Sequence, residues 1–420
     1  MNWQASLDSS NSTTQQAEQK AGPLDGIKVL EFAELVAGPY CGKLLADLGA
    51  EVIKIERPGF GDDARQRGPF LGDVPHPERS GLFLYLNTNK LGITLNVNLP
   101  TGKDILKRLV KGTDILIEDK PSDVLKGMGL DYERLNVVNP KLIMTSISPF
   151  GQRGPHSSYK AYHLNVYHGT GEGYILPANI EDPMQRAPVK AAGFLGDYEA
   201  GVGAATASLM AWYWRASTSL GQHIDFSKQE WGMLMPYLIV RYPSEGVSVN
   251  RVTGTYHVFG LLPCKEGYVV LQVFSEQHWQ NLVKAMGDPE WTKDKKYSNM
   301  VSRAQHGKEV NQHIIAWLKN FSNKEVFQRL QEHHVICGMV NNPQDLLQTE
   351  HFRSRKFFVE TEHPEVGKIE YPSVPYKFSK TPYRTVRPAP LLGQHNEEIY
   401  CQRLGYSKQD LVRLRGTGII

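Results

Sequence analysis

The spacing of apolar residues near the start of the chain predicts a strand, a helix and a second strand. Val29–Phe32 is a short, mostly apolar run of the kind that forms a buried strand. Leu44, Leu45 and Leu48 then recur at the spacing of one helix face, and Val52–Ile55 is the next short run. This order is typical of a βαβ unit with parallel strands.

Turn residues mark both ends of the helix in this unit. Pro39, in the turn Ala37-Gly38-Pro39, suits the first helical position, because the N–H that proline lacks would be unpaired there. Gly49 fits just past the last helical turn. The start of such a helix commonly binds a phosphorylated ligand. Since the G-x-G-x-x-G fingerprint is missing, we expect a phosphorylated ligand other than a dinucleotide.

The same alternation continues toward the middle of the chain. Ile93–Leu95, Ile115–Ile117 and Leu142–Ser148 have the pattern of strands, and Thr101–Lys111 has the spacing of a helix. His223–Phe226 is a further strand-like run. Strands that alternate with helices predict the α/β class with a mostly parallel sheet.

Later regions and the N-terminus have other patterns. Tyr268–Phe274 alternates like a strand, Glu276–Met286 is amphipathic, and Glu290–Arg329 is charged and helical, which predicts a smaller α+β domain. Leu404–Gly418 predicts a final helix. With 420 residues and 40% hydrophobic content, the chain is long enough for two domains. Residues 1–20 are polar, so we expect a disordered tail that is neither a signal peptide nor an anchor.

Charge and cysteine content narrow the expected partners and compartment. A formal net charge of +3 is too near neutral to indicate nucleic acid or an anionic membrane surface. No apolar run has the length of a membrane span. The four cysteines are isolated in the sequence, at Cys41, Cys264, Cys337 and Cys401. This distribution favours the reducing cytoplasm and argues against disulfides and a cysteine-rich metal site, so we expect no metal.

Asp197 is the candidate for chemistry, and its surroundings allow two compatible interpretations. It follows Gly196 and precedes a run of small residues, Gly201–Ala211. From the residues alone, the favoured interpretation is a helix N-cap, worth about 1 kcal/mol to the helix. The other is a nucleophilic carboxylate, because a desolvated aspartate can attack the carbonyl of a thioester.

Four motifs give the chain a resemblance to a known family. They are Ala37-Gly38-Pro39, Leu48-Gly49-Ala50, Val52–Glu56 and Gly61-Asp62. In this combination the chain resembles the family III CoA-transferases of the CaiB–BaiF type, which include carnitine, bile-acid and formyl-CoA transferases. The similarity extends from about Pro23 to the C-terminus.

The resemblance implies an architecture that periodicity does not reveal. Residues 22–225 and 350–420 would jointly build one large Rossmann-like, CoA-binding domain, and residues 245–345 would form the small domain. Two subunits of such a protein thread through each other, so the resemblance implies an interlocked homodimer.

The resemblance also implies roles for particular residues. Asp197 matches the family's nucleophilic aspartate, and Gly221-Gln222 matches the pair that follows its small-residue helix. Leu91 departs from the pattern, because the family has an arginine there. The positions that correspond to CoA contacts are Val36, Ala37, Arg57, Asn89, Lys90, Asp119, Lys120 and Ser148.

The implied activity is transfer of CoA from an acyl-CoA thioester to a free carboxylic acid, through a covalent intermediate on Asp197. The acyl-CoA and the acid would be the substrates. CoA would enter and leave as part of substrate and product, with no cofactor permanently bound.

Two alternatives stay open at this point. The α-methylacyl-CoA racemases of the same superfamily use an Asp–His pair, which here would be Asp197 and His163. Their Gly-His-Asp triplet is Tyr162-His163-Leu164 in this chain, and a histidine in that context is more often packed or hydrogen-bonded than catalytic. The other alternative is a non-catalytic CoA-binding protein in which Asp197 is only a helix cap.

Overall fold

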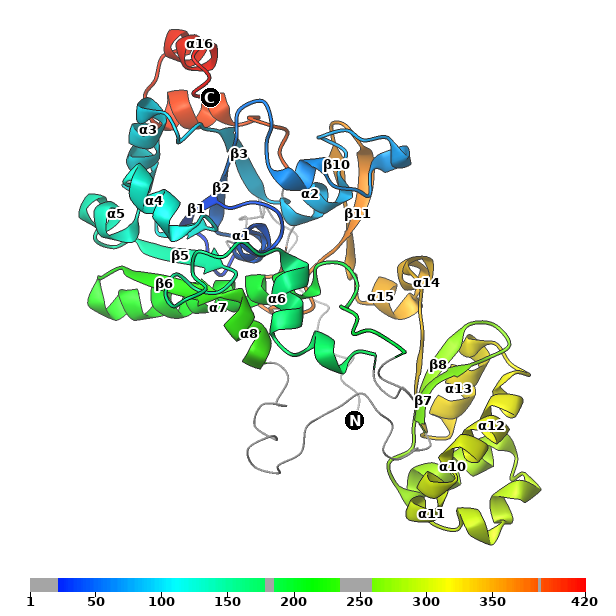
Figure 1. Cartoon of the computed structure of the whole chain (residues 1–420). Coiled ribbons are helices and arrows are strands. Elements are labelled where there is room, and N and C mark those ends of the chain that lie inside the picture. The colour runs from blue at the N-terminus through cyan, green and yellow to red at the C-terminus, as the bar shows by residue number, and fades with distance from the viewer. Residues whose placement is uncertain (1–21, 178–184, 235–258, 384–386) are drawn as a thin grey trace. The chain divides into compact units, whose positions relative to one another are not determined.

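The computed structural model describes residues 22–177, 185–234, 259–383 and 387–420 (Figure 1). The predicted tail, residues 1–20, lies outside the described residues, and so do residues 245–258 of the predicted small domain. The described residues form two compact units. The larger unit holds 22–173, 190–234 and the described part of 357–420; the smaller holds 174–177, 185–189 and 259–356. The described part of 174–189, predicted in the large domain, and residues 350–356 therefore belong to the smaller unit.

A six-stranded sheet, entirely parallel, forms the centre of the larger unit among its described residues. Its spatial order is β3-β2-β1-β4-β5-β6. The predicted α/β class is thereby confirmed, and the strand order is that of a Rossmann-type doubly wound sheet. The strands are β1(Lys28–Phe32), β2(Glu51–Glu56), β3(Lys90–Thr94), β4(Ile115–Glu118), β5(Ile143–Ser148) and β6(Gln222–Ser227).

Helices cover both faces of this sheet. On one face, α1(Ala37–Asp47) packs against α7(Leu195–Thr218) over buried residues of β1, β2, β4 and β5. The small residues of α7 permit this close approach, since a Cβ on Gly201 would lie 2.8 Å from the Ala37 carbonyl oxygen. The other face carries α3(Pro100–Val110), α5(Tyr132–Val138) and α16(Lys408–Gly416).

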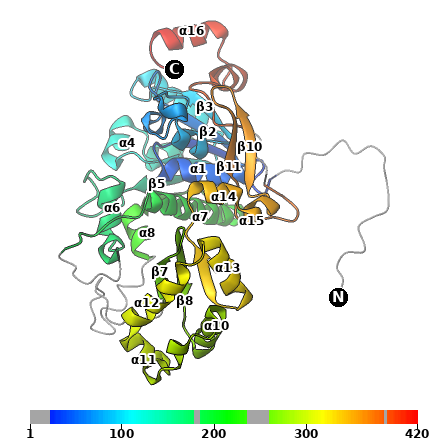
Figure 2. The same ribbon diagram turned by 90° about the vertical axis from the view of Figure 1, so that its right-hand side faces the viewer.

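The C-terminal part of the chain packs against β3. The side chain of Asn396 accepts a hydrogen bond from the Thr94 N–H at 2.9 Å, and the Tyr400 hydroxyl donates to the Thr94 carbonyl at 2.7 Å. Asn396 lies directly before a π-helical turn, η6(Glu397–Arg403), and Tyr400 lies within it; this turn precedes α16 (Figure 2). The remaining elements of this unit include α2(Gly81–Leu86), α4(Ser122–Met128), α6(His163–Gly169), α8(Lys228–Leu234) and the hairpin β10(Phe358–His363)–β11(Gly367–Pro372).

The smaller unit has a core of its own. Its described part contains an antiparallel sheet in the order β7-β8-β9, with helices packed on it. It is thus α+β in composition. The strands and helices are β7(Phe259–Pro263), β8(Tyr268–Gln272), β9(Ile336–Met339), α10(Glu276–Met286), α11(Met300–Gln305), α12(Gly307–Leu318), α13(Asn323–Glu332), α14(Pro343–Gln348) and α15(Glu350–Ser354).

Three predicted boundaries need correction. The strand predicted from Ile93 begins at Lys90, because this lysine is buried against Glu31 rather than exposed. Pro39 is the third residue of α1, not the first. The final helix is shorter than predicted, since α16 begins only at Lys408.

Candidate active site

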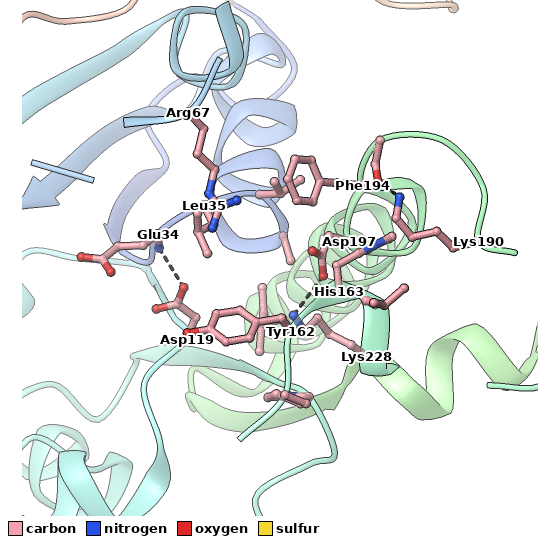
Figure 3. A pocket seen from close by; sticks show the side chains of 17 residues that line it. Glu34, Leu35, Arg67, Asp119, Tyr162, His163, Lys190, Phe194, Asp197 and Lys228 are labelled. Atoms are coloured by element: carbon pink, nitrogen blue, oxygen red, sulfur yellow. Dashed lines mark hydrogen bonds and ion pairs between the residues drawn. The ribbon is translucent and has the colours of Figure 1, made fainter. Parts of the chain in front are cut away.

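A cavity of about 600 Å³ lies at the carboxyl ends of β1, β4 and β5 (Figure 3). Residues 34–37 line it directly after β1, Asp119 lines it directly after β4, and Ile147 and Pro149 line it around the end of β5. β1 and β4 are the neighbours at which the strand order changes direction. In open α/β sheets, this is the position at which ligands bind.

Asp197 lies in this cavity, in the first turn of α7. The prediction that it caps the helix is wrong: the N-cap residue is Phe194, whose side chain makes no capping hydrogen bond. Gly193, with a φ of 61°, turns the chain earlier than expected, and the Phe194 carbonyl accepts hydrogen bonds from the N–H groups of Asp197 and Tyr198. The carboxylate is consequently free to face the cavity. Its place at the start of a 24-residue helix favours negative charge.

Lys228 supplies the polar contact of this carboxylate. Its Nζ lies 2.9 Å from Asp197 Oδ1, and the two side chains are 15% and 11% exposed. Lys228 is the first residue of α8, directly after β6, and it also lines the cavity (Figure 3). Sequence analysis missed this residue. Its position just past a predicted strand was the available signal, because functional side chains gather at the carboxyl ends of such strands.

His163 lines the same cavity from the start of α6. Its Nε2 accepts a hydrogen bond from the Gly196 N–H at 3.2 Å, and its ring packs against Tyr167 and Phe194. Burial lowers the pKa of His163, and the nearby Lys190 and Lys228 act in the same direction, against the Asp197 charge. The ring is therefore neutral near pH 7, and its Nε2 lone pair is occupied. This geometry disfavours the racemase alternative, which needs a free base here.

The turn after β1 is held by two carboxylates, the buried Asp62 and the half-buried Asp119. The Leu35 N–H donates to Asp62 Oδ1 at 2.9 Å, and the Glu34 N–H donates to Asp119 Oδ2 at 2.8 Å. Leu35 has a φ of 65°, a conformation that costs energy for any residue with a Cβ. The two hydrogen bonds offset this cost and fix the turn, which places Val36 and Ala37, at the start of α1, in the lining of the cavity.

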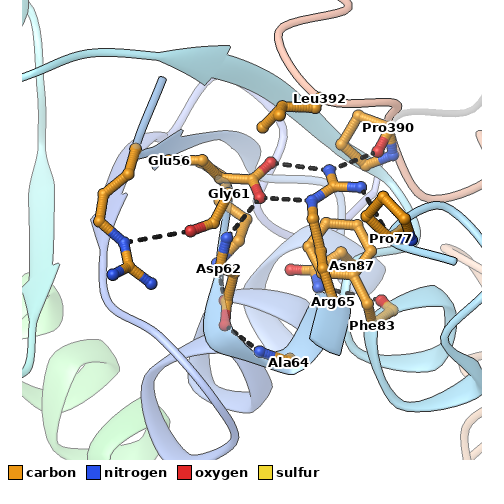
Figure 4. Close-up of polar contacts among 12 residues, drawn as sticks. Glu56, Gly61, Asp62, Ala64, Arg65, Pro77, Phe83, Asn87, Pro390 and Leu392 are labelled. Carbon is orange, nitrogen blue, oxygen red and sulfur yellow. Dashed lines mark hydrogen bonds and ion pairs between the residues drawn. The ribbon is translucent and has the colours of Figure 1, made fainter. Parts of the chain in front are cut away.

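A network of buried ion pairs supports this turn through Asp62. Lys54, fully buried, binds Asp62 at 2.7 Å and Glu31 at 2.9 Å. Burial alone would raise the pKa of Asp62, but the Lys54 charge and the hydrogen bonds to its carboxylate outweigh this and lower the pKa. Next to it, the Arg65 guanidinium makes two hydrogen bonds to Glu56, at 2.6 and 2.9 Å (Figure 4). The network therefore holds Asp62 charged and in place.

Comparison with known proteins decides the family, because the model for CoA-transferase family III matches residues 24–396. The chain belongs to CoA-transferase family III. It is 31% identical over 404 residues to a succinyl-CoA–D-citramalate CoA-transferase of Chloroflexus aurantiacus, covering 95% of this chain and 98% of the relative. It is 30% identical to a formyl-CoA:oxalate CoA-transferase of Rhodopseudomonas palustris, covering 94% and 97%. A CAIB/BAIF family protein from Brucella suis has a similar structure, with a TM-score of 0.80, 28% identity, and coverage of 91% and 99%.

The resemblance stated from the sequence motifs is thus confirmed, and the protein is a CoA-transferase. The interpretation as a non-catalytic binding protein is set aside accordingly. No helix in the described part of the chain is long and apolar enough to cross a membrane. The same residues contain no group of three or more His, Cys, Asp and Glu side chains placed to hold a metal ion.

The predicted CoA contacts of this family III enzyme fall into three groups. Val36, Ala37 and Asp119 line the cavity. Arg57 and Lys120 border it, since both form ion pairs with the cavity residue Glu34, at 3.1 and 3.4 Å.

Ser148 belongs to the same border. It lies between the lining residues Ile147 and Pro149, and its Oγ is buried without a hydrogen-bond partner among the described residues. A bound ligand is one way to satisfy such an atom.

Asn89 and Lys90 form the third group, which does not line the cavity. The Lys90 ammonium contacts Glu31, the Pro39 carbonyl and Asn87 at 2.7 to 2.8 Å, and it is fully buried. The Asn89 amide donates to Asp47 at 2.8 Å. A CoA phosphate would reach Lys90 only after this network opened, because all three donors of the ammonium are occupied.

Besides Lys228, two further cations of the cavity were not predicted. Lys190 Nζ donates to the carbonyls of Ala191 and Gly193, at 3.0 and 2.8 Å, and so supports the turn before α7. Arg67 lines the cavity with an exposed side chain. Neither residue lies in a motif from which its position could have been foreseen.

Proposed function

We propose that this enzyme transfers CoA from an acyl-CoA thioester to a free carboxylic acid through a covalent intermediate on Asp197. The observation that carries the proposal is the position of the Asp197 carboxylate, which faces a cavity at the carboxyl ends of the sheet. The carboxylate is buried enough to be largely desolvated, which strengthens it as a nucleophile.

The reaction follows from carboxylate and thioester chemistry. A carboxylate oxygen of Asp197 attacks the thioester carbonyl, the C–S bond breaks, and an acyl-aspartyl anhydride and CoA thiolate form. The thiolate attacks the aspartyl carbonyl, releasing the donor acid and leaving an aspartyl-CoA thioester. The acceptor carboxylate then attacks this thioester and expels the thiolate. Attack of the thiolate on the acceptor's carbonyl gives the new acyl-CoA and restores Asp197.

For CoA we propose contacts that combine the cavity and its border. Val36 and Ala37 lie at the start of α1, where the helix dipole favours a negatively charged group. Arg57 and Lys120 both pair with Glu34 in the turn before α1, and they suit the CoA phosphates. The Ser148 hydroxyl, which has no hydrogen-bond partner among the described residues, suits a hydrogen bond to the ligand. Asp119 contributes by holding the turn, and Asn89 and Lys90 support α1 from within the protein.

The two relatives compared above guide the choice of acids. Their names include citramalate and oxalate, which carry two carboxyl groups. We therefore propose that small dicarboxylic acids are the first acceptors to test.

We also propose that the enzyme is an interlocked homodimer in the cytoplasm. One observation supports an interface on α7, whose outward face carries large apolar side chains with 39% to 79% exposure. Several large apolar side chains exposed along one helix commonly mark an interaction surface. The residues are Leu195, Val202, Met210, Tyr213 and Trp214.

An isotope-exchange experiment tests the proposed function. The enzyme is incubated with succinyl-CoA and isotopically labelled succinate, then with the corresponding pairs for oxalate and citramalate. Label should enter the acyl-CoA in at least one pair. Solvent deuterium entering the α-carbon of an acyl-CoA without an acceptor acid would instead support racemase chemistry. If neither reaction occurs with any of the pairs, the proposal is contradicted.

A further inference from the structure

The charges that line the cavity are balanced while Asp197 is free. Three acidic side chains, Glu34, Asp119 and Asp197, face three basic ones, Arg67, Lys190 and Lys228. Formation of an acyl or thioester bond removes the negative charge of Asp197. The covalent intermediate of the proposed mechanism therefore leaves the cavity with one excess positive charge.

The cation that loses its partner in this intermediate is the Lys228 ammonium. Within the described part of the chain, Asp197 is the one hydrogen-bond partner found for its ammonium. The other cations of this region have separate partners or are solvated: Lys190 donates to two backbone carbonyls, Lys120 pairs with Glu34 and Asp119, and Arg67 is exposed. Since the Lys228 side chain is only 15% exposed, water compensates little for the loss of the carboxylate.

We propose that Lys228 is a further catalytic residue, which exchanges the carboxylate of Asp197 for the carboxylate of the acceptor acid. In the free enzyme Lys228 binds Asp197. Once Asp197 is a neutral thioester, the ammonium binds the acceptor carboxylate and places it beside the aspartyl carbonyl that it must attack. The inference rests on the proposed function, because it needs a covalent intermediate on Asp197.

The exchange moves no proton and needs no co-reactant. An oxygen of the acceptor carboxylate forms a bond to the aspartyl carbonyl carbon, the C–S bond breaks, and its electron pair leaves with the CoA thiolate. Lys228 keeps its proton throughout. The acceptor loses its negative charge when the anhydride forms, and the Asp197 carboxylate released at the end of the cycle pairs with the ammonium again. The same contact acts in reverse on the leaving donor acid.

The consequence is an order of binding. In the resting enzyme, a free acid would have to compete with Asp197 for the Lys228 ammonium. In the covalent intermediate, the ammonium has lost that partner and is available to the acid. The acid should therefore bind weakly before CoA transfer to Asp197 and more tightly after it.

A binding experiment tests this without turnover. Asp197→Asn removes the charge of Asp197 while keeping its shape, and so mimics the neutral intermediate. Binding of succinate and of oxalate is measured by calorimetry on the wild type, on Asp197→Asn and on Asp197→Asn/Lys228→Met. Asp197→Asn should bind at least one acid about 10–100-fold more tightly than the wild type, and the second substitution should abolish this gain. Equal binding to all three proteins would overturn the proposal.

A kinetic experiment provides a second readout in the wild-type background. Lys228→Met should raise the KM for the acceptor acid about 10–100-fold with an unchanged KM for acyl-CoA, and Lys228→Arg should restore part of the loss. Lys111→Met, which removes an exposed lysine after α3, is the matched control. An unchanged acid KM, or an equal rise in both KM values, would contradict a role toward the acceptor. Absence of any intermediate on Asp197 in the wild type would refute the proposed function itself. That result can be told apart from the two KM outcomes, which concern Lys228 alone.

Discussion

The two sides of the cavity use charged residues in opposite ways. Behind the turn after β1, the ion pairs are fully buried and each cation has several partners, as Lys54 does with Glu31 and Asp62. On the side of α7, Asp197 and Lys228 form one ion pair that remains partly exposed and reaches the cavity.

This difference is what we expect if the buried ion pairs serve the structure and the Asp197–Lys228 pair serves the proposed chemistry. A buried charge with several partners is held in one position, and it cannot change partner without a large loss of stability. A single ion pair at a cavity can open when one partner reacts. We expect substitutions in the first region to affect mainly folding and substitutions in the second to affect mainly turnover.

The largest effect is expected for Asp197→Asn. A neutral amide does not form the anhydride, so turnover should fall by roughly three orders of magnitude or more. Stability should fall less than turnover does, because α7 loses no cap but Lys228 loses its charged partner. Steady-state rates and thermal unfolding together check this. Near-normal turnover of the variant would exclude Asp197 as the nucleophile.

The next largest effect is expected for Lys54→Met, and it concerns stability. Removing the cation leaves the buried Asp62 without its cation, while Glu31 keeps Lys90, and this should cost about 3–5 kcal/mol. Adding Asp62→Asn should recover part of this loss, since it removes the orphaned charge. Denaturant unfolding measures both variants, and Lys111→Met serves as the exposed control. If Lys54→Met were as stable as the wild type, the comparison between the two regions would fail.

A smaller effect is expected for Arg57→Ala at the border of the cavity. Its side chain is 46% exposed and already paired with Glu34 and Asp63, so the loss of one contact to a CoA phosphate is partly screened. The KM for acyl-CoA should rise about 10-fold with little change in the KM for the acid. Arg413→Ala, on the exposed face of α16, is the control. A KM equal to that of the wild type would remove Arg57 from the CoA site.

The smallest effect is expected on the molecular mass of the protein when it is diluted. Interlocked subunits cannot separate without partial unfolding, so the molecular mass should stay that of a dimer down to nanomolar protein. Mass photometry at nanomolar protein and sedimentation at micromolar protein check this. A monomer at micromolar concentration would refute the proposed assembly and leave the apolar face of α7 unexplained.

Much of the larger unit could be predicted because its strands are short apolar runs. β1, β2, β4, β5 and β6 all lie within one or two residues of their predicted positions. The start of β3 was missed because Lys90 looks like a surface residue in the sequence. Its partner Glu31 lies far away in the chain, and only the fold brings the two charges together.

Site residues that lie in a sequence motif could be predicted, whereas those brought to the site only by a tertiary contact could not. Val36, Ala37, Asp119 and Asp197 were found by resemblance and lie together in the cavity. Lys228 was missed, because its role depends on a contact between residues 31 positions apart. The cap interpretation of Asp197 failed because the turn at Gly193 starts α7 earlier than the small-residue pattern indicates.

The most direct test of the account is identification of the residue that carries CoA. The wild-type enzyme is incubated with an acyl-CoA that it uses, without acceptor acid, and then treated with hydroxylamine. A peptide digest analysed by mass spectrometry should contain a hydroxamate at Asp197, because hydroxylamine cleaves the aspartyl thioester. The Asp197→Asn protein should contain none. A modification found on another residue, or none on Asp197 while CoA exchange proceeds, would contradict the mechanism.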